Sequence, residues 1–456
     1  MIKQLLQKIW GGNSSASVAH KTSPLQAQPL TFSQPIKTPD GNAMKKVDGN
    51  PGLRVAKLIM VTAKNNNKFY EMEETADGMI RVSYGRVGSP GTFTTYPAGR
   101  WKSLYNSKVR KGYKDQTQLF AQVSKDFSFA DIDDAAVQEL INALMRYAKK
   151  SIQRNYVVSA EDVTALQVEA AQKLLDGLVK KVKMKMDVTN FNEELLDLYQ
   201  VIPRRMHNVR DHLLQGPPVG YKGLAVIREM LSEEQSTLDV MRSQVELNGK
   251  QQSAMAKEES INLLEAMGLQ IETEEDPKMI KQIKKLMGPH SANFAKAYKV
   301  NNIRTRTAFD AHLAKADDQK LELFWHGSRN ENWMSILETG LVLRPANAVI
   351  NGKMFGYGLY FADKFKKSLN YTSLRGSYWA GGTQGRGYLA LFDVHVGRQY
   401  KIKKHQSWCY ELNEKNLKKK GAYDSLYARG GADLVNNEYI VYNQAQCTVR
   451  YLVEVK

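Results

Sequence analysis

The chain contains 456 residues, of which 65 are lysine or arginine and 47 are aspartate or glutamate, so its formal net charge is +18. This length suits about two to four domains with well-buried cores. Two cysteines are too few for a disulfide framework or a four-cysteine zinc site, and the eight histidines show no metal-ligand spacing, so we expect no metal.

The sequence also lacks the features of a membrane or secreted protein. No apolar run approaches the roughly 20 residues that span a bilayer. Charged and polar side chains interrupt residues 1–10, which therefore lack the apolar core of a signal peptide. We expect an intracellular protein without a membrane partner, nuclear if its source is eukaryotic and cytoplasmic if it is bacterial or viral.

The positive charge is unevenly spread. The net charge is +4 over residues 1–50, +7 over 51–120, −1 over 121–314 and +8 over 315–456. Lysine and arginine favour polyanions because they release counterions from phosphates, although a merely soluble basic protein explains the charge alone equally well. Residues 1–52 are rich in small and polar residues with few large apolar ones, so we predict a flexible basic tail.

Short apolar runs predict a small sheet in residues 53–120. Strands are expected at Leu58–Ala63, Lys68–Met72 and Met79–Val87, with a turn over the three asparagines between the first two. The apolar residues of Arg100–Gly112 recur at helical spacing, and lysine and arginine occupy much of the remaining surface. This part should therefore be a sheet with one basic helix.

The segment Tyr84-Gly85-Arg86-Val87-Gly88 ends the third predicted strand. An arginine between glycines can direct its guanidinium to a phosphate, and an aromatic ring can stack on a base or sugar. With Asn-Asn-Lys-Phe-Tyr upstream and the basic helix downstream, the segment is similar to the WGR domain that accompanies poly(ADP-ribose) polymerases, with tyrosine in place of tryptophan. The alternative is an arginine in an ordinary turn. The resemblance implies binding to DNA ends or nicks, with these candidate contacts: Tyr84, Arg86, Arg100, Trp101 and Lys102.

Residues 127–314 have the apolar periodicity of helices. Stripes run from Val137 to Ala148 and from Val163 to Val182, and Ser159 with Asp162 is a candidate cap for the second helix. Further helices are expected at Asn192–Tyr199 and after the prolines at 217 and 218, with a polar loop at Gly249–Lys257. These stripes are typical of a bundle core.

The length and position of this helical block, and the run Leu195–Pro203, resemble the helical regulatory domain of DNA-dependent poly(ADP-ribose) polymerases. In that family the domain restrains access of NAD until DNA is bound. The resemblance therefore implies autoinhibition.

Residues 315–456 return to strands and turns. Strands are expected at Leu321–Trp325, Gly387–Val396, Tyr400–Lys403 and Tyr439–Tyr442. They indicate a mixed, mainly antiparallel sheet. A short helix should end at Gly340, and another over Phe365–Tyr371 should place Ser368 and Tyr371 on one face.

Four motifs follow one another in this last block. They are His326-Gly327-Ser328, the run from Met354 to Asp363, Ser368-Leu369-Asn370-Tyr371, and the run from Asn437 to Tyr442. Each alone is a weak signal, because an isolated histidine, tyrosine or glutamate near a strand end is more often structural. In this order and with these flanking residues, they resemble the catalytic domain of poly(ADP-ribose) polymerases, which transfer ADP-ribose from NAD to an acceptor.

The resemblance implies a role for each motif residue. Glu438 would bond the ribose 2′-hydroxyl, stabilise the oxocarbenium-like centre that forms as nicotinamide leaves, and polarise the acceptor hydroxyl. His326 would bond the adenosine ribose, Tyr360 would complete a His-Tyr-Glu triad, and Tyr371 would stack on nicotinamide. The remaining implied NAD contacts are Gly327, Ser328, Ser368 and Arg344, the last standing two residues after Val342, where the family often has arginine.

The predicted protein is thus multidomain α+β: a WGR-like sheet with a helix at 53–120, an all-α bundle at 127–314, and a mixed, mainly antiparallel β ADP-ribosyltransferase domain at 315–456. The implied function is a DNA-stimulated poly(ADP-ribose) polymerase that uses NAD as substrate and modifies proteins, including itself. Glu438 favours elongation, because polymer-forming family members carry glutamate there. A mono-ADP-ribosyltransferase, a nucleic-acid-end ADP-ribosyltransferase and a catalytically inactive DNA-end-binding scaffold are the alternatives.

Overall fold

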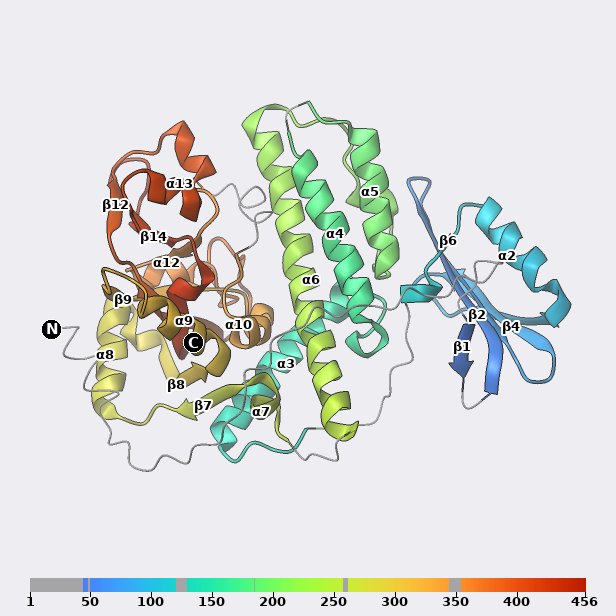
Figure 1. Cartoon of the computed structure of the whole chain (residues 1–456), viewed down its shortest axis with the longest axis horizontal. Coiled ribbons are helices and arrows are strands. Elements are labelled where there is room, and N and C mark those ends of the chain that lie inside the picture. Colours follow the sequence, from blue (N-terminus) through green and yellow to red (C-terminus); the bar gives the residue numbers. More distant parts are fainter. Residues whose placement is uncertain (1–43, 48–49, 120–128, 184, 257–260, 344–353) are drawn as a thin grey trace.

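The structure is a computed structural model that describes residues 44–47, 50–119, 129–183, 185–256, 261–343 and 354–456. Most of the predicted basic tail and the predicted NAD contact Arg344 lie outside these residues. A small sheet lies at one end of the longest dimension, long helices lie in the middle, and further sheets lie at the other end (Figure 1).

The first part is an antiparallel sheet in the order β1-β2-β3-β4-β5, with β6 paired to β2. Its strands are β1 (Met44–Val47), β2 (Asn50–Thr62), β3 (Asn66–Glu74), β4 (Met79–Arg86), β5 (Thr92–Pro97) and β6 (Lys114–Asp115). The predicted basic helix is α2 (Trp101–Arg110). Two strands begin inside the stretch predicted to be a tail, because β1 gains backbone hydrogen bonds from β2 that composition does not reveal.

The middle part consists of long helices. They are α3 (Ala135–Asn155), α4 (Ala165–Lys181), α5 (Val188–Val201) and α6 (Gly220–Ala256). The predicted cap of the second helix is wrong: Ser159 bonds Asp162 in a short 3-10 turn, and Thr164 with Gln167 forms the capping box of α4.

Helix α6 also continues through most of the stretch predicted to be a polar loop. That loop was expected at Gly249–Lys257, whereas the helix ends at Ala256. Glutamine, lysine, alanine and methionine are good helix formers, so the polar composition of this stretch did not require a break. The buried Ala254 shows that one face of the last turn still packs against the protein.

The third part contains two sheets instead of the single predicted one. The larger is antiparallel throughout, in the order β7-β8-β15-β11-β9. Its strands are β7 (Leu269–Thr273), β8 (Phe294–Asn302), β9 (Leu321–Gly327), β11 (Gly387–His395) and β15 (Cys447–Val455). Strands β7 and β8 precede residue 315, so the expectation of helices alone up to residue 314 is wrong.

The smaller sheet has the order β10-β14-β13-β12. Its strands are β10 (Leu359–Phe361), β12 (Gln399–Ile402), β13 (Ser425–Ala428) and β14 (Glu438–Val441). Only β12 and β13 are parallel among the described pairs, so the prediction of mixed, mainly antiparallel structure is confirmed. The accompanying helices are α7 (Leu263–Met267), α8 (Pro277–Met287), α9 (Ile303–Leu313), α10 (Trp333–Thr339), α12 (Phe365–Leu369) and α13 (Glu414–Lys419).

The cores join these parts to one another. Ile59 and Val61 of β2 pack into the core formed by α3 to α6, and Leu140 and Leu144 of α3 pack into the core of the larger sheet. Helix α3 therefore contributes to both the helical core and the sheet core. Among the described residues, no helix has the length and apolar character needed to cross a bilayer.

Candidate active site

Neighbouring strands bring together the histidine, tyrosine and glutamate predicted to be catalytic. His326 lies on β9, and an antiparallel bridge between Trp325 and Ala362 joins that strand to the residue after β10. Strand β10 in turn pairs with β14, with Tyr360 opposite Ile440. Glu438 is the first residue of β14. Side chains separated by more than 100 positions in the sequence thus lie on adjacent segments.

The imidazole of His326 is oriented by the tyrosine strand. Its Nδ1 lies 3.1 Å from the carbonyl oxygen of Tyr360, so Nδ1 carries the proton and donates to that oxygen. The ring of His326 also packs edge-on to Phe361 and Phe392, with centroids 5.9 Å away in both cases. These contacts fix the imidazole plane.

The carboxylate of Glu438 is paired with a lysine that we did not predict as a site residue. Lys367 Nζ on α12 donates to Glu438 Oε1 at 2.8 Å and to the carbonyl oxygen of Asn437 at 3.1 Å. Both side chains are largely buried. Lys367 stands one residue before the predicted Ser368, so its place between two motifs was the available signal.

The hydroxyl of Tyr360 is bonded to the backbone of the preceding turn. It accepts from Phe355 N at 3.0 Å and donates to Gly356 O at 3.2 Å. Burial and the nearby charge of Glu438 raise the pKa of Tyr360 well above its ordinary value, while the bond from Phe355 N lowers it. The phenol is therefore neutral at physiological pH, and its hydroxyl positions the 355–356 turn.

Glycines allow the strands and α12 to approach closely. A Cβ atom on Gly327 would lie 1.9 Å from the backbone oxygen of Ser368, and one on Gly358 would lie 2.2 Å from the Ile440 side chain. A side chain at either position would push β9 away from α12, or β10 away from β14. The spacing of the candidate residues depends on these contacts.

Ser368 and Tyr371 lie where α12 ends, beside the glutamate. Ser368 is buried, and Tyr371 N donates to Ser368 O at 3.1 Å in the turn that follows the helix. The ring of Tyr371 is 44% exposed, which leaves it accessible to a ligand. Burial and, to a lesser extent, the charge of Glu438 raise the pKa of Tyr371.

Ser328 is linked to the helical part through an asparagine. Asn332 Nδ2 donates to Ser328 Oγ at 3.0 Å, and Ser236 Oγ of α6 donates to Asn332 Oδ1 at 3.1 Å. Helix α6 therefore contacts a predicted NAD-binding side chain through a single intervening residue. Neither Ser236 nor Asn332 was predicted, because nothing in their sequence neighbourhoods distinguishes them.

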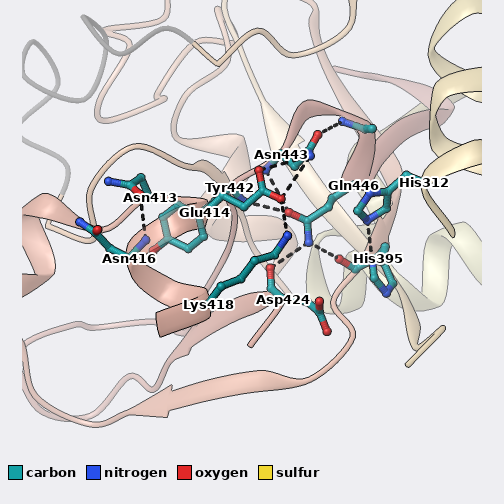
Figure 2. Close-up of polar contacts among 11 residues, drawn as sticks. His312, His395, Asn413, Glu414, Asn416, Lys418, Asp424, Tyr442, Asn443 and Gln446 are labelled. Carbon is teal, nitrogen blue, oxygen red and sulfur yellow. Dashed lines mark hydrogen bonds and ion pairs between the residues drawn. The ribbon is translucent and has the colours of Figure 1, made fainter. Parts of the chain in front are cut away.

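A buried polar network holds the far end of β14 in place (Figure 2). Gln446 Oε1 accepts from the backbone N–H groups of Tyr442 and Asn443, and Gln446 Nε2 donates to the carbonyl oxygens of His395 and Asp424. A glutamine whose oxygen and amide protons are all engaged fixes the backbone around it. The strand that begins with Glu438 is therefore anchored at its other end.

The composition of the site suits NAD as a substrate. The accessible ring of Tyr371 offers a stacking face, and the Glu438 carboxylate is held by Lys367 on the helix that precedes this tyrosine. A cavity of about 460 Å³ lies elsewhere, between α4 and α6, and its charged lining includes Lys173, Asp176 and Arg242. The residues that line that cavity include no aromatic side chain, unlike the strand site with Tyr371. Within the described ranges, no three histidine, cysteine or acidic side chains are arranged to hold a metal ion.

Two of the predicted nucleic-acid contacts are already engaged within the protein. Arg86 donates to the carbonyl oxygens of Asn65 at 3.0 Å and His207 at 2.8 Å, so its guanidinium joins the small sheet to the segment between α5 and α6. Trp101 is 1% exposed and packs in the sheet core beneath Arg54. The contact of Trp101 with nucleic acid stays a prediction, and its indole is buried in this structure.

The other predicted contacts remain on the surface. Tyr84 is 38% exposed, and Arg100 and Lys102 are exposed on either side of the buried tryptophan. Phe93 on β5 is 71% exposed and lies opposite Ser83, next to Tyr84 on β4. An exposed phenylalanine on a basic sheet is a candidate stacking residue that sequence alternation alone did not identify.

Comparison with known proteins agrees with this geometry. Residues 273–456 match the family model described as poly(ADP-ribose) polymerase catalytic domain. The chain is 32% identical over 190 residues to the putative poly [ADP-ribose] polymerase-like 100L of invertebrate iridescent virus 6, which covers 40% of this chain and 95% of that protein. It is 25% identical to poly [ADP-ribose] polymerase 2 of Zea mays over 86% of this chain and 68% of the maize protein.

The matched region contains all four catalytic motifs and begins at the end of β7. It therefore includes β8, which the sequence-based boundary at residue 315 left out. The chain belongs to the poly(ADP-ribose) polymerase family and is an ADP-ribosyltransferase that uses NAD.

Proposed function

We propose that this chain is a DNA-stimulated poly(ADP-ribose) polymerase that modifies protein side chains, its own included, and extends the attached chain. The observation that carries the proposal is that adjacent segments bring together His326, Tyr360 and Glu438, with the exposed Tyr371 following the helix whose Lys367 pairs with Glu438. A carboxylate beside an accessible aromatic face is what a nicotinamide–ribose bond requires for cleavage.

The transfer step follows from these positions. Tyr371 would stack on nicotinamide, and His326 would hold the adenosine ribose through the ring nitrogen that does not bond Tyr360. As the bond to nicotinamide breaks, positive charge develops on the ribose and the Glu438 carboxylate stabilises it. The same carboxylate would then accept a hydrogen bond from the acceptor hydroxyl, which makes its oxygen a better nucleophile.

Lys367 fixes the position of this carboxylate. The Lys367 amine, 2.8 Å from Glu438, holds one of the carboxylate oxygens in place. The other oxygen is then directed by a fixed side chain, and we assign it to the ribose. Lys367 is a positioning residue in this scheme.

We also propose that the enzyme elongates the attached ADP-ribose into a chain. Elongation is supported by glutamate at position 438, which polymer-forming members of the family carry, and by similarity to proteins named poly [ADP-ribose] polymerase. An acceptor that is itself a ribose hydroxyl needs a carboxylate that can bind two hydroxyl groups in turn, and glutamate can do so.

DNA stimulation is supported by the contacts between the three parts. Arg86 of the small sheet bonds His207, beyond α5, and Ser236 of α6 reaches Ser328 through Asn332. A DNA phosphate that attracted Arg86 would compete with the carbonyl oxygens that it now contacts. We propose that this exchange loosens the helical part and frees the NAD site.

Incubation of the full chain with labelled NAD, with and without a nicked duplex, tests the proposal. A ladder of products on protein that grows with DNA is the expected result. A single addition would favour mono-ADP-ribosylation, label on the oligonucleotide would favour nucleic-acid ends as acceptors, and the absence of any label would contradict transferase activity.

A further inference from the structure

A cluster of aromatic rings extends outward from Tyr371. Tyr378 is 74% exposed and Trp379 is 64% exposed, compared with 44% for Tyr371. The rings of Tyr371 and Trp379 are nearly parallel, at an angle of 21° with centroids 6.5 Å apart, and Tyr378 packs edge-on against the indole at 4.8 Å. Three contiguous rings are thus presented to solvent on one loop.

Backbone hydrogen bonds hold this loop in a defined shape. Trp379 N and Ala380 N both donate to the carbonyl oxygen of Asn370, at 3.0 and 3.1 Å. The buried hydroxyl of Ser377 donates to Leu369 O at 3.0 Å, and Arg375 N donates to Gln384 O at 2.9 Å. Because these bonds fix the chain on both sides of Trp379, the rings are held out by the fold and do not hang from a loose loop.

Exposing large rings costs free energy, so a rigid exposed cluster calls for an explanation. Isolated apolar residues on a surface are ordinary, but a contiguous set of rings marks an interaction site. Lining a pocket cannot be the reason here, since Trp379 and Tyr378 are more exposed than the ring that is assigned to nicotinamide.

The charge of the surrounding segment indicates the kind of partner. Residues 364–392 contain five lysine or arginine residues and no aspartate or glutamate. Lys367 and Arg386 pair with glutamates from other segments. Among the described residues, no carboxylate pairs with Lys364, Lys366 or Arg375, each of which is exposed. A segment that carries exposed cations and exposed rings is complementary to a chain of phosphates and bases.

We propose that Tyr378 and Trp379, with Arg375, form a binding surface for single-stranded nucleic acid at the edge of the transferase site. Successive bases stack on the two rings, and the cations contact the phosphates. This surface is separate from the small sheet proposed to bind DNA ends, and it does not depend on that assignment. A strand bound here would lie beside the candidate active site, since Trp379 stacks near Tyr371 and Tyr371 follows the helix whose Lys367 pairs with Glu438.

Photo-crosslinking locates this contact directly. The full chain is irradiated with a single-stranded oligonucleotide of roughly ten nucleotides carrying 5-bromouracil, a length within the range that one binding surface covers, and is then digested with trypsin. Cleavage after Arg375 and Arg386 releases the peptide Gly376–Arg386, which contains both rings. We expect this peptide to carry crosslinked nucleotide, whereas crosslinks found only in peptides of residues 44–119 would overturn the proposal.

Binding measurements with variants complete the test. Trp379→Ala should weaken oligonucleotide binding by about fivefold or more, and Arg375→Glu should weaken it and reduce its salt dependence. Tyr410→Ala is the matched control, because Tyr410 is also 52% exposed but lies outside this loop, and its loss should leave affinity unchanged. Unchanged affinity in Trp379→Ala contradicts the proposal.

A third readout separates nucleic acid from the growing ADP-ribose chain as the occupant. If Trp379→Ala shortens the polymer made from NAD but leaves oligonucleotide binding intact, the surface takes the polymer and the proposal is wrong. A wild-type chain that makes no polymer would count against the proposed function alone, since crosslinking does not require catalysis.

Discussion

The candidate active site and the candidate DNA surface differ in what their side chains already contact. His326, Tyr360 and Glu438 are fixed by strand pairing, by glycine-mediated packing and by Lys367, and their arrangement does not require a ligand. At the small sheet, Arg86 bonds backbone carbonyl oxygens of the protein, and Trp101 is buried. The candidate active site is preorganised, whereas the candidate DNA surface would have to give up internal contacts for Arg86 to reach a phosphate.

Substitutions in the two regions should therefore affect activity in different ways. Changes at the transferase site should reduce activity whether or not DNA is present. Changes at the junction of the small sheet and the helices should alter the response to DNA and leave the chemistry intact. The predictions below use this distinction.

Gly327→Ala should strongly reduce activity through packing alone. The new methyl group would lie 1.9 Å from Ser368 O, so β9 and α12 must separate. Displacement of reacting groups by about 1 Å can cost about 100-fold in rate, and we expect a loss of this size with and without DNA. Gly385→Ala is the control, because nothing lies within 4 Å of its Cβ position. Near-normal activity in Gly327→Ala would show that the close packing is unnecessary.

Arg86→Ala should reduce the stimulation by DNA about tenfold, which is the worth of one hydrogen bond to a charged group. Activity without DNA should rise, because Arg86 no longer joins the small sheet to the segment between α5 and α6. Arg81→Ala, which removes an exposed arginine from the opposite face of β4, serves as the control. Steady-state rates at saturating NAD, with and without nicked duplex, provide the measurement, and equal stimulation in both variants would contradict the role of Arg86.

Ser236→Ala should raise activity in the absence of DNA by about two- to tenfold, the equivalent of one neutral hydrogen bond. The substitution cuts the bond from α6 to Asn332 but keeps the bond from Asn332 to Ser328. Thr237→Ala is the matched control, since its hydroxyl bonds only the carbonyl of Glu233 within α6. Basal activity that stays at the wild-type level would remove Ser236 from the regulatory path.

Glu74→Gln should have the smallest effect and should be confined to the small sheet. The bond from Arg54 lowers the pKa of Glu74, so its stabilisation is complete above the unfolded-state pKa near 4.5 and is lost as pH falls through the lower folded-state pKa. We expect a loss of about 1 kcal/mol at pH 7, measured by hydrogen exchange of the β2 and β3 amides. Glu71→Gln, whose pair with Lys57 is longer and exposed, should be nearly neutral.

The sequence predicted most of the elements that hold the active site, because local patterns determine them. Strands β9, β11, β12 and β14 and the glycine that ends α10 lie close to their predicted places. The pairing of Lys367 with Glu438 could not be predicted, since it depends on the packing of α12 against a distant strand. The membership of β7 and β8 in the catalytic sheet was missed for the same reason: strand partners are not a local property.

The DNA surface shows a different limit of sequence reasoning. The helical spacing of the apolar residues placed Trp101 on a helix correctly. An apolar side chain on a basic helix can nevertheless face either solvent or the sheet. In the structure Trp101 faces the sheet, and the guanidinium of Arg54 lies over its ring. The motif around Arg86 was located correctly as a strand end, yet its contact with His207 joins two parts that are 121 positions apart in the sequence.

The central claim is that Glu438 acts on the ribose of NAD and on the acceptor from one fixed position. Labelled NAD is incubated with the wild-type chain and with Glu438→Gln, and both nicotinamide release and product length are measured. The account predicts that wild-type protein forms polymer, whereas the amide variant loses elongation and releases nicotinamide at least about 100-fold more slowly. Polymer of normal length from Glu438→Gln would contradict it.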